Sequence, residues 1–163
     1  MDDAQRTFHE LTGEMDYTML IVTTCAEGMQ AGCLVGFATQ CSVDPPRFVV
    51  FLSNKNRTLR VAERSEALLV HFVPADAAGL VELFGTETGD DLDKFARCRW
   101  KAGPGGLPVL QDAPRWFAGK ILERQAVGDH VGFLLEPFAA ESAGEPGSFL
   151  FHRAKPLEPG HAP

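Results

Sequence analysis

Short apolar runs separated by turn residues constrain the fold of this chain more than any other feature of its sequence. Residues Thr18 to Cys25 are apolar and rich in β-branched side chains. After a turn at Ala26-Glu27-Gly28, a second run of mostly small residues extends from Gln30 to Ser42. Asp44-Pro45-Pro46 ends this run, because proline cannot donate a hydrogen bond to a strand ladder. The pattern indicates strands joined in hairpins.

The same pattern continues along the chain. Further strands are predicted at Arg47 to Leu52, Ala67 to Val73, Trp116 to Val127, His130 to Phe138 and Ser148 to His152. Helical spacing predicts short helices or turns at Thr7 to Glu14, Arg57 to Ser65, Asp76 to Phe84 and Asp90 to Trp100. The length of 163 residues fits one domain. We therefore expect a single barrel-like, mainly β domain over residues 1–163, with a core at about 17–152 and a loose tail at 153–163.

Charge and composition restrict the partners of the chain. The formal net charge is −7, from 22 acidic and 15 basic residues. Such a surface repels phosphate backbones, so a nucleic acid partner is not expected. No apolar run is long enough to cross a membrane, and the start of the chain does not resemble a signal peptide. The four cysteines lack metal-ligand spacing and are expected to be buried free thiols, which suits the cytoplasm.

The common catalytic motifs are missing from the sequence. It contains no G-x-x-x-x-G-K-[ST] phosphate loop, no G-x-G-x-x-G fingerprint, no H-E-x-x-H and no G-x-S-x-G. A doubly wound nucleotide-binding fold is therefore not supported. Three weaker features remain as candidates for chemistry.

The first feature is the run of small residues from Gly32 to Ser42. Gly36, Ala38 and Thr39 would let a flat aromatic cofactor approach the backbone. The alternative is a barrel corner that needs glycine for structural reasons.

The second feature is the polar loop from Ser53 to Thr58, before a predicted helix. Lys55 and Arg57 supply positive charge, and helix starts offer free amides, so the loop suits a phosphate. The alternative is a polar turn in which Asn56 caps the helix.

The third feature is Gly128-Asp129-His130 at a predicted hairpin turn. His130 could face a ligand there, and the alternative is a turn histidine exposed to water. His71 lies in an apolar run and is expected to be a core residue with its hydrogen bonds satisfied.

The order of these features resembles the flavin reductase-like family. The segment from Gly32 to Pro46 is similar to its core signature of small residues followed by Asp-Pro-Pro, and Ser53 to Thr58 is similar to its phosphate loop. Asp93-Lys94-Phe95 and Gly128-Asp129-His130 resemble its later landmarks. The resemblance implies a six-stranded antiparallel split barrel that forms a homodimer and binds flavin near the subunit interface.

The resemblance also implies roles for individual residues. The isoalloxazine ring of FMN or FAD would lie against Phe37, Ala38, Thr39 and Gln40, with Phe95 nearby. The ribityl phosphate would be held by Ser53, Asn54, Asn56, Arg57 and Thr58. His130 would lie on the nicotinamide side.

The implied activity is hydride transfer from NADH or NADPH to flavin, with release of reduced flavin to a partner monooxygenase in many relatives. This chemistry belongs to the cofactors, so the missing catalytic triad is expected. Two alternatives remain. One is a split barrel that binds deazaflavin or haem, and the other is a flavin-binding protein without turnover.

Overall fold

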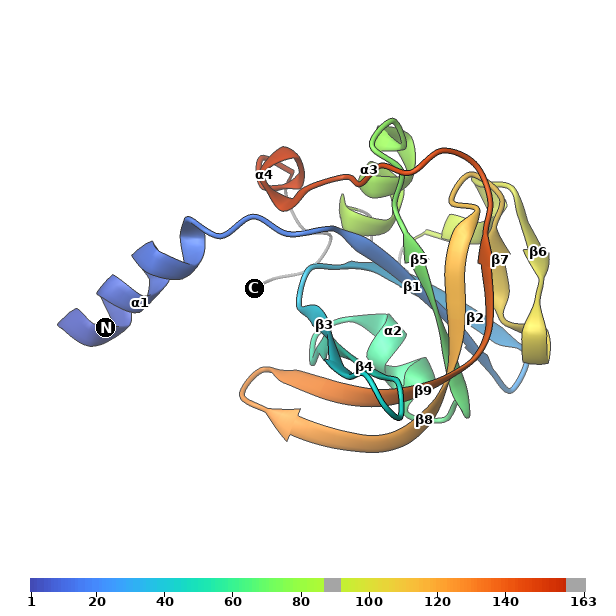
Figure 1. Cartoon of the computed structure of the whole chain (residues 1–163), viewed down its shortest axis with the longest axis horizontal. Coiled ribbons are helices and arrows are strands. Elements are labelled where there is room, and N and C mark those ends of the chain that lie inside the picture. The colour runs from blue at the N-terminus through green and yellow to red at the C-terminus, as the bar shows by residue number, and fades with distance from the viewer. Residues whose placement is uncertain (87–91, 158–163) are drawn as a thin grey trace.

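The computed structural model describes residues 1–86 and 92–157. Its main sheet has seven antiparallel strands in the order β2-β1-β5-β8-β9-β4-β3 (Figure 1). These strands are β1 Leu20–Ala26, β2 Met29–Val35, β3 Ala38–Ser42, β4 Arg47–Ser53, β5 Ala67–Phe72, β8 Arg115–Val127 and β9 His130–Ser142. A separate pair is formed by β6 Trp100–Ala102 and β7 Pro108–Leu110.

Short helices surround this sheet. The α-helices are α1 Asp3–Gly13, α2 Arg57–Ala62, α3 Ala78–Thr86 and α4 Phe151–Ala154, and the 3-10 turns are η1 Lys94–Ala96 and η2 Pro104–Gly106. Both α2 and α3 pack near β2, at one end of the sheet order. Among the described helices, none is long and apolar enough to cross a membrane.

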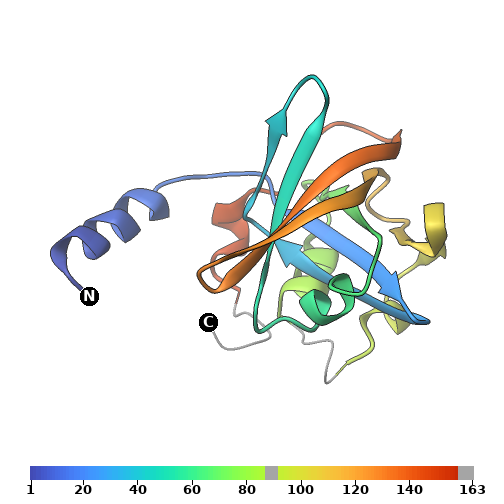
Figure 2. The ribbon, with the colours of Figure 1, turned by 90° about the horizontal axis from the view of Figure 1, so that it is seen from below.

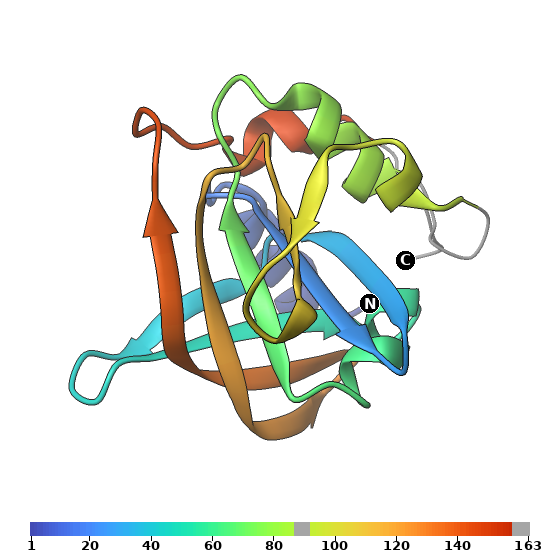
Figure 3. The ribbon, with the colours of Figure 1, turned by 90° about the vertical axis from the view of Figure 1, so that its right-hand side faces the viewer.

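The sheet curls into a barrel, as Figure 3 shows, and the side chains inside it are apolar. Alternate residues of the strands point inward, which is the two-residue period of a strand. The interior includes Leu20, Val22, Val50, Phe133 and Leu135, all almost fully buried. The mainly β barrel predicted from the sequence is therefore present.

The predicted count of six strands is wrong, because the run from Gln30 to Ser42 forms two strands. β2 pairs with β1 up to Val35, whereas β3 starts at Ala38 and pairs with β4. The break falls at Gly36, where an added Cβ would lie 2.7 Å from Cε2 of Tyr17. A continuous run of small residues thus conceals the point where the chain leaves one end of the sheet for the other.

Two other segments also differ from the prediction. The helix expected at Asp90 to Trp100 is reduced to the turn η1, with residues 90 and 91 outside the described part of the chain, and Trp100 begins β6. Instead of a strand at Ser148 to His152, Leu150 forms an isolated bridge to Thr18 and α4 follows. Ala154 of α4 is buried, so the packed body extends beyond residue 152.

His71 is a satisfied core residue, as predicted. It is fully buried on β5, and its ring nitrogens lie 3.0 Å from the Ile21 carbonyl oxygen and 3.0 Å from the Leu110 amide nitrogen. The ring therefore links β5 to β1 and to β7.

All four cysteines are free, but they are not all buried. Cys33 is buried and Cys41 on the edge strand β3 is exposed. Burial raises the pKa of the Cys33 thiol, although the charge of Lys94 and a hydrogen bond with Thr58 oppose this. Cys33 is thus a packing residue beneath the region described next.

Candidate cofactor site

A pocket of about 360 Å³ lies between β2, the start of α2 and the turn η1. It is lined by Met29, Gln30, Ala31, Gly32, Arg57, Thr58, Leu92, Asp93, Lys94 and Phe95. Arg57 and Thr58, both predicted from the sequence, therefore meet the predicted Phe95 in one pocket, although Phe95 lies far from them in the chain.

Two cationic side chains give the pocket its electrostatic character. Nη1 of Arg57 donates a hydrogen bond to the carbonyl oxygen of Gln30 at 3.1 Å, and this bond holds the guanidinium against β2. Lys94 is only 5% exposed, and its Nζ donates to the carbonyl oxygens of Gly32 and Phe84, each at 3.2 Å. With the carboxylate of Asp93 also in the lining, these two positive charges leave the pocket with a net charge of about +1, which favours an anionic ligand.

Close packing behind β2 depends on Gly32. An added Cβ at this position would lie 2.9 Å from Cε1 of Phe84 and 3.2 Å from the Val22 carbonyl oxygen. Phe84 in turn packs edge-on against Phe95, with ring centroids 5.7 Å apart. The pocket is therefore bounded by the backbone of β2 at Gly32 and by the ring of Phe95, which Phe84 supports from behind, and this arrangement suits a planar ligand.

The loop from Ser53 to Thr58 leads from β4 into α2. Asn56 caps the helix as predicted, since its Oδ1 accepts from the Thr58 amide at 2.9 Å. The Ser53 Oγ accepts from the Lys55 amide at 3.3 Å. Thr58 is 1% exposed. Arg57 is thus the member of this loop that is best placed to meet a phosphate.

A second group of predicted residues lies where the loop meets the β8–β9 turn. His130 pairs with Ser53 across the two strands, and the Asn54 amide donates to the Asp129 carbonyl oxygen at 2.9 Å. The rings of His130 and Phe37 are 5.2 Å apart. We call Phe37, Ser53, Asn54, Asp129 and His130 the histidine cluster.

Asp129 orients the imidazole within the histidine cluster. Its Oδ1 lies 2.6 Å from Nδ1 of His130. This hydrogen bond, followed by the charge interaction with His130, lowers the pKa of the Asp129 carboxyl. Because Nδ1 is engaged by the carboxylate, Nε2 remains the nitrogen available for a ligand.

The remaining predicted residues, Ala38, Thr39 and Gln40, lie on β3 and do not line the pocket. Ala38 packs against the barrel interior. The Thr39 hydroxyl donates to the Gln40 carbonyl oxygen, and the side-chain Nε2 of Gln40 donates to the Ser42 carbonyl oxygen. Since β3 is the last strand of the sheet, this segment offers edge backbone groups rather than side chains.

Sequence reasoning did not select Gln30, Gly32 or Lys94 as binding residues, although they line the pocket. In the sequence, Lys94 stands out only as part of the Asp93-Lys94-Phe95 motif. A lysine beside Phe95 in a short segment gives no sign that its amine is buried, because the carbonyl groups that receive it come from Gly32 and Phe84.

Comparison with solved structures places the fold in a known class. The structure aligns with that of nitrilotriacetate monooxygenase component B from Mycobacterium thermoresistibile with a TM-score of 0.81 and 23% identity. The alignment covers 93% of this chain and 84% of the other. It also matches NADH:FAD oxidoreductase SgcE6 of Streptomyces globisporus at a TM-score of 0.82 and 20% identity, over 93% of this chain and 90% of the other. At these identities the likeness defines the fold alone.

The sequence itself gives the family. The model of the flavin reductase like domain matches residues 12–157, so the chain belongs to that family. A curated relative, FMN reductase (NADH) RutF of Methylorubrum extorquens, is 26% identical over 162 residues, which cover 96% of this chain and 78% of the relative. The family resemblance inferred from the ordered motifs is therefore confirmed.

Proposed function

We propose that this protein is an NADH-dependent flavin reductase that passes hydride to FMN or FAD. The observation that carries the proposal is the pocket at which Arg57 and Lys94 hold positive charge beside the Gly32 wall, in a chain of the flavin reductase like family. Family relatives and structural neighbours whose names specify NADH, FMN or FAD support the choice of reductant and of flavin.

The charged groups of the pocket indicate where the phosphate end of the ligand would bind. Arg57 and the buried Lys94 suit the phosphate of a flavin nucleotide, because charge-assisted bonds to phosphate are stronger than neutral ones. The isoalloxazine ring would then meet Phe95 and the edge backbone of Ala38, Thr39 and Gln40. Asn54 and Arg57 are three residues apart, so at most about 11 Å of chain separates the histidine cluster from the pocket. One extended ligand can contact both.

The protein's own task is to position the reactants. A bound flavin supplies the hydride acceptor, and no protein nucleophile is required. His130, with Nδ1 held by Asp129, lies with its ring 5.2 Å from the ring of Phe37, and the nicotinamide is proposed to lie beside these two rings. Phe37 is 56% exposed, which leaves one face available for stacking.

We also propose that the protein is a homodimer. Val50 and Leu52 of β4 point into the barrel, so Val49 and Phe51 point to its outer face, and Val49 pairs with Leu134 of β9. All three outward residues are partly exposed. We call Val49, Phe51 and Leu134 the outer apolar face. It is continuous with the histidine cluster through the Ser53–His130 pair, so a second copy there would adjoin the ligand site.

Two further parts of the proposal concern the cellular setting. The free cysteines suit a reducing compartment such as the cytoplasm. The structural neighbour named as a monooxygenase component supports a monooxygenase as the acceptor of reduced flavin.

The sharpest test compares FMN with riboflavin, which lacks the phosphate. We expect Arg57→Ala to raise the Kd for FMN about 10- to 150-fold, as lost charge-assisted bonds do, and to change the Kd for riboflavin far less. The control is Arg60→Ala, an exposed arginine on the same helix that is outside the pocket lining. Equal weakening of both flavins would show that Arg57 only supports the loop.

Activity is measured in the same preparations. Purified protein should oxidise NADH when FMN or FAD is added. Flavin binding without NADH oxidation would instead indicate a flavin-binding protein without turnover, and a lack of binding by any flavin would end the proposal.

A further inference from the structure

The N-terminal helix α1 stands away from the barrel. Figures 1 and 2 show it projecting from one end of the molecule in two perpendicular views. All of its residues lie in the described part of the chain, and none is buried. The flavin site and the barrel core make no use of this helix, so its presence needs another explanation.

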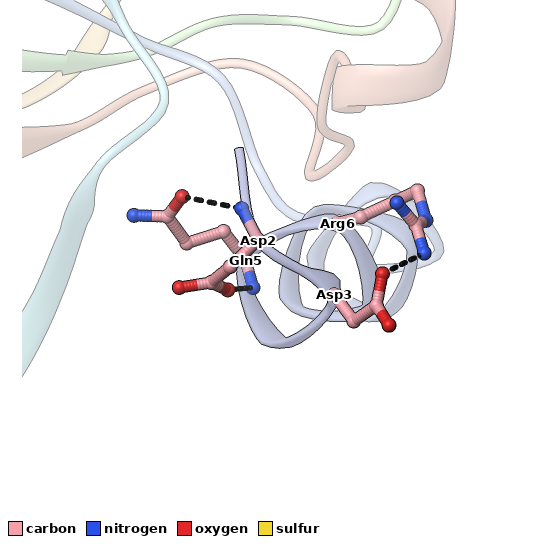
Figure 4. A network of polar contacts seen from close by, with 4 residues as sticks. All are labelled: Asp2, Asp3, Gln5 and Arg6. Carbon is pink, nitrogen blue, oxygen red and sulfur yellow. Dashed lines mark hydrogen bonds and ion pairs between the residues drawn. The ribbon is translucent and has the colours of Figure 1, made fainter.

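The helix is well specified by its sequence. Asp2 caps it, with Oδ1 accepting from the Gln5 amide at 2.8 Å, and the Gln5 side chain accepts from the Asp2 amide at 3.2 Å (Figure 4). Asp3 and Arg6 form an ion pair one turn along. Even so, an isolated helix of 11 residues is marginal in water, and most helices depend on packing of an apolar face.

One face of α1 is apolar and uncovered. Ala4, Phe8 and Leu11 recur at spacings of four and three, and Met15 follows four residues later. Phe8, Leu11 and Met15 are 59%, 61% and 57% exposed. We call these four residues the arm stripe. Large apolar side chains in a continuous stripe mark an interaction surface.

The chain after α1 is held against the body by contacts of Asp16 and Tyr17. The Asp16 Oδ1 accepts from the His152 amide at 3.1 Å, and the Tyr17 carbonyl oxygen accepts from the Phe151 amide at 2.9 Å. The rings of Tyr17 and Phe151 stack with centroids 4.6 Å apart. These contacts fix the chain from Asp16 onward, so the part that projects is confined to the residues before Asp16.

A matching apolar surface lies at the same end of the molecule. In both views the β8–β9 turn projects toward the side from which α1 extends (Figures 1 and 2). Val127 before this turn and Phe37 beside His130 are 40% and 56% exposed. They extend the outer apolar face toward the arm. A two-fold axis at this end would bring each arm beside the turn of the other copy.

We propose that the arm stripe of each protomer packs on Phe37 and Val127 of a second copy, beside the partner's histidine cluster. This inference rests on the proposed homodimer and adds α1 to the contacts between its two copies. Symmetric exchange covers both exposed surfaces at once, whereas a membrane is a poor occupant because residues 2–14 carry four acidic side chains and one arginine.

The test is a double-mutant cycle on the dimer dissociation constant, measured with the full chain by analytical ultracentrifugation. We expect Phe8→Glu with Leu11→Glu to weaken the dimer on the order of 100-fold, since two apolar side chains lose their burial. Glu10→Lys, on the polar side of the helix, changes a charge without altering the stripe and should leave the constant nearly unchanged. Glutamate is a good helix former, and helicity by circular dichroism verifies that the arm persists.

The second substitution in the cycle tests whether the arm stripe contacts Val127 of the other copy. Val127→Glu alone should also weaken the dimer, and adding it to the Phe8/Leu11 variant should cost little more, because contacting residues are not additive. Additive losses would overturn the assignment of the arm to this surface. A dimer unaffected by the stripe substitutions would overturn the arm exchange while leaving the dimer proposal standing. A monomeric wild-type protein would overturn both, and NADH oxidation tests the flavin function independently of either result.

Discussion

The buried His71 ring provides a quantitative test of how this barrel is held together. Its environment contains one acceptor, the Ile21 carbonyl oxygen near Nδ1, and one donor, the Leu110 amide near Nε2. Only the neutral ring with its proton on Nδ1 satisfies both. Burial lowers the pKa of His71 to about 4, against a smaller opposing effect of the Ile21 bond.

This lowered pKa makes stability depend on pH in a defined window. Above the ordinary histidine pKa of 6.5 the folded and unfolded chains are both neutral at this residue, and its stabilising contribution is complete. As the pH falls from 6.5 toward 4, the unfolded chain binds a proton that the folded chain does not bind, so stability is lost. The linkage relation gives a loss of about 1.4 kcal/mol at about pH 5.5 and about 2.5 kcal/mol at about pH 4.5.

Urea unfolding at fixed protein concentration measures this loss. The carboxyl groups titrate in the same range, so the useful quantity is the difference between the wild type and His71→Asn, which has no titratable group at this position. Asn keeps a donor near the Ile21 oxygen but leaves the Leu110 amide without its acceptor, so the variant should be less stable near neutral pH. The wild-type advantage should shrink by about 2.5 kcal/mol between about pH 7.5 and 4.5. A difference that is constant with pH would refute the assignment of a neutral, fully buried ring.

Two further substitutions test the site. Asp129→Asn should lower kcat/KM for NADH roughly two- to five-fold, the value of an exposed ion pair, and should leave FMN affinity unchanged, whereas unaltered turnover would make Asp129 an ordinary turn residue. Gly32→Ala should destabilise the fold by about 1–3 kcal/mol and weaken FMN, because its Cβ would meet Phe84, whose carbonyl oxygen holds Lys94. Gly79→Ala on α3, where nothing lies within 4 Å of an added Cβ, is the control in thermal melts and FMN titrations, and equal behaviour of the two variants would contradict the packing argument.

Local chemistry made much of the fold predictable. Proline after Asp44 ended a strand, Asn56 capped a helix, and the long β8–β9 hairpin followed from two apolar runs around Gly128-Asp129. The core position of His71 followed from its apolar neighbours in sequence. Each of these features depends on residues close together in the chain, which is where propensities and turn chemistry act.

Contacts across the barrel were not predictable in the same way. The division of the small-residue run at Gly36 depends on the ring of Tyr17, and the burial of Lys94 depends on carbonyl groups of β2 and α3. The segment before residue 152 looked like a strand, yet pairing there reduces to the Thr18–Leu150 bridge because the chain turns into α4. In every case the deciding partner is distant in sequence.

The loop from Ser53 to Thr58 shows how ordered motifs led to the proposed site. Its first half is tied to the histidine cluster through the Asn54 amide and the Asp129 carbonyl oxygen, and its second half is tied to β2 through Arg57 and the Gln30 carbonyl oxygen. A short loop with both ends fixed sets the separation between the two groups of residues. Its length and polar composition are visible in the sequence, whereas the residues that it brings together are not. The loop is therefore the part of the site where a linear motif carries three-dimensional information, and an inserted residue between Asn54 and Arg57 would disturb ligand binding without removing any side chain that contacts the ligand.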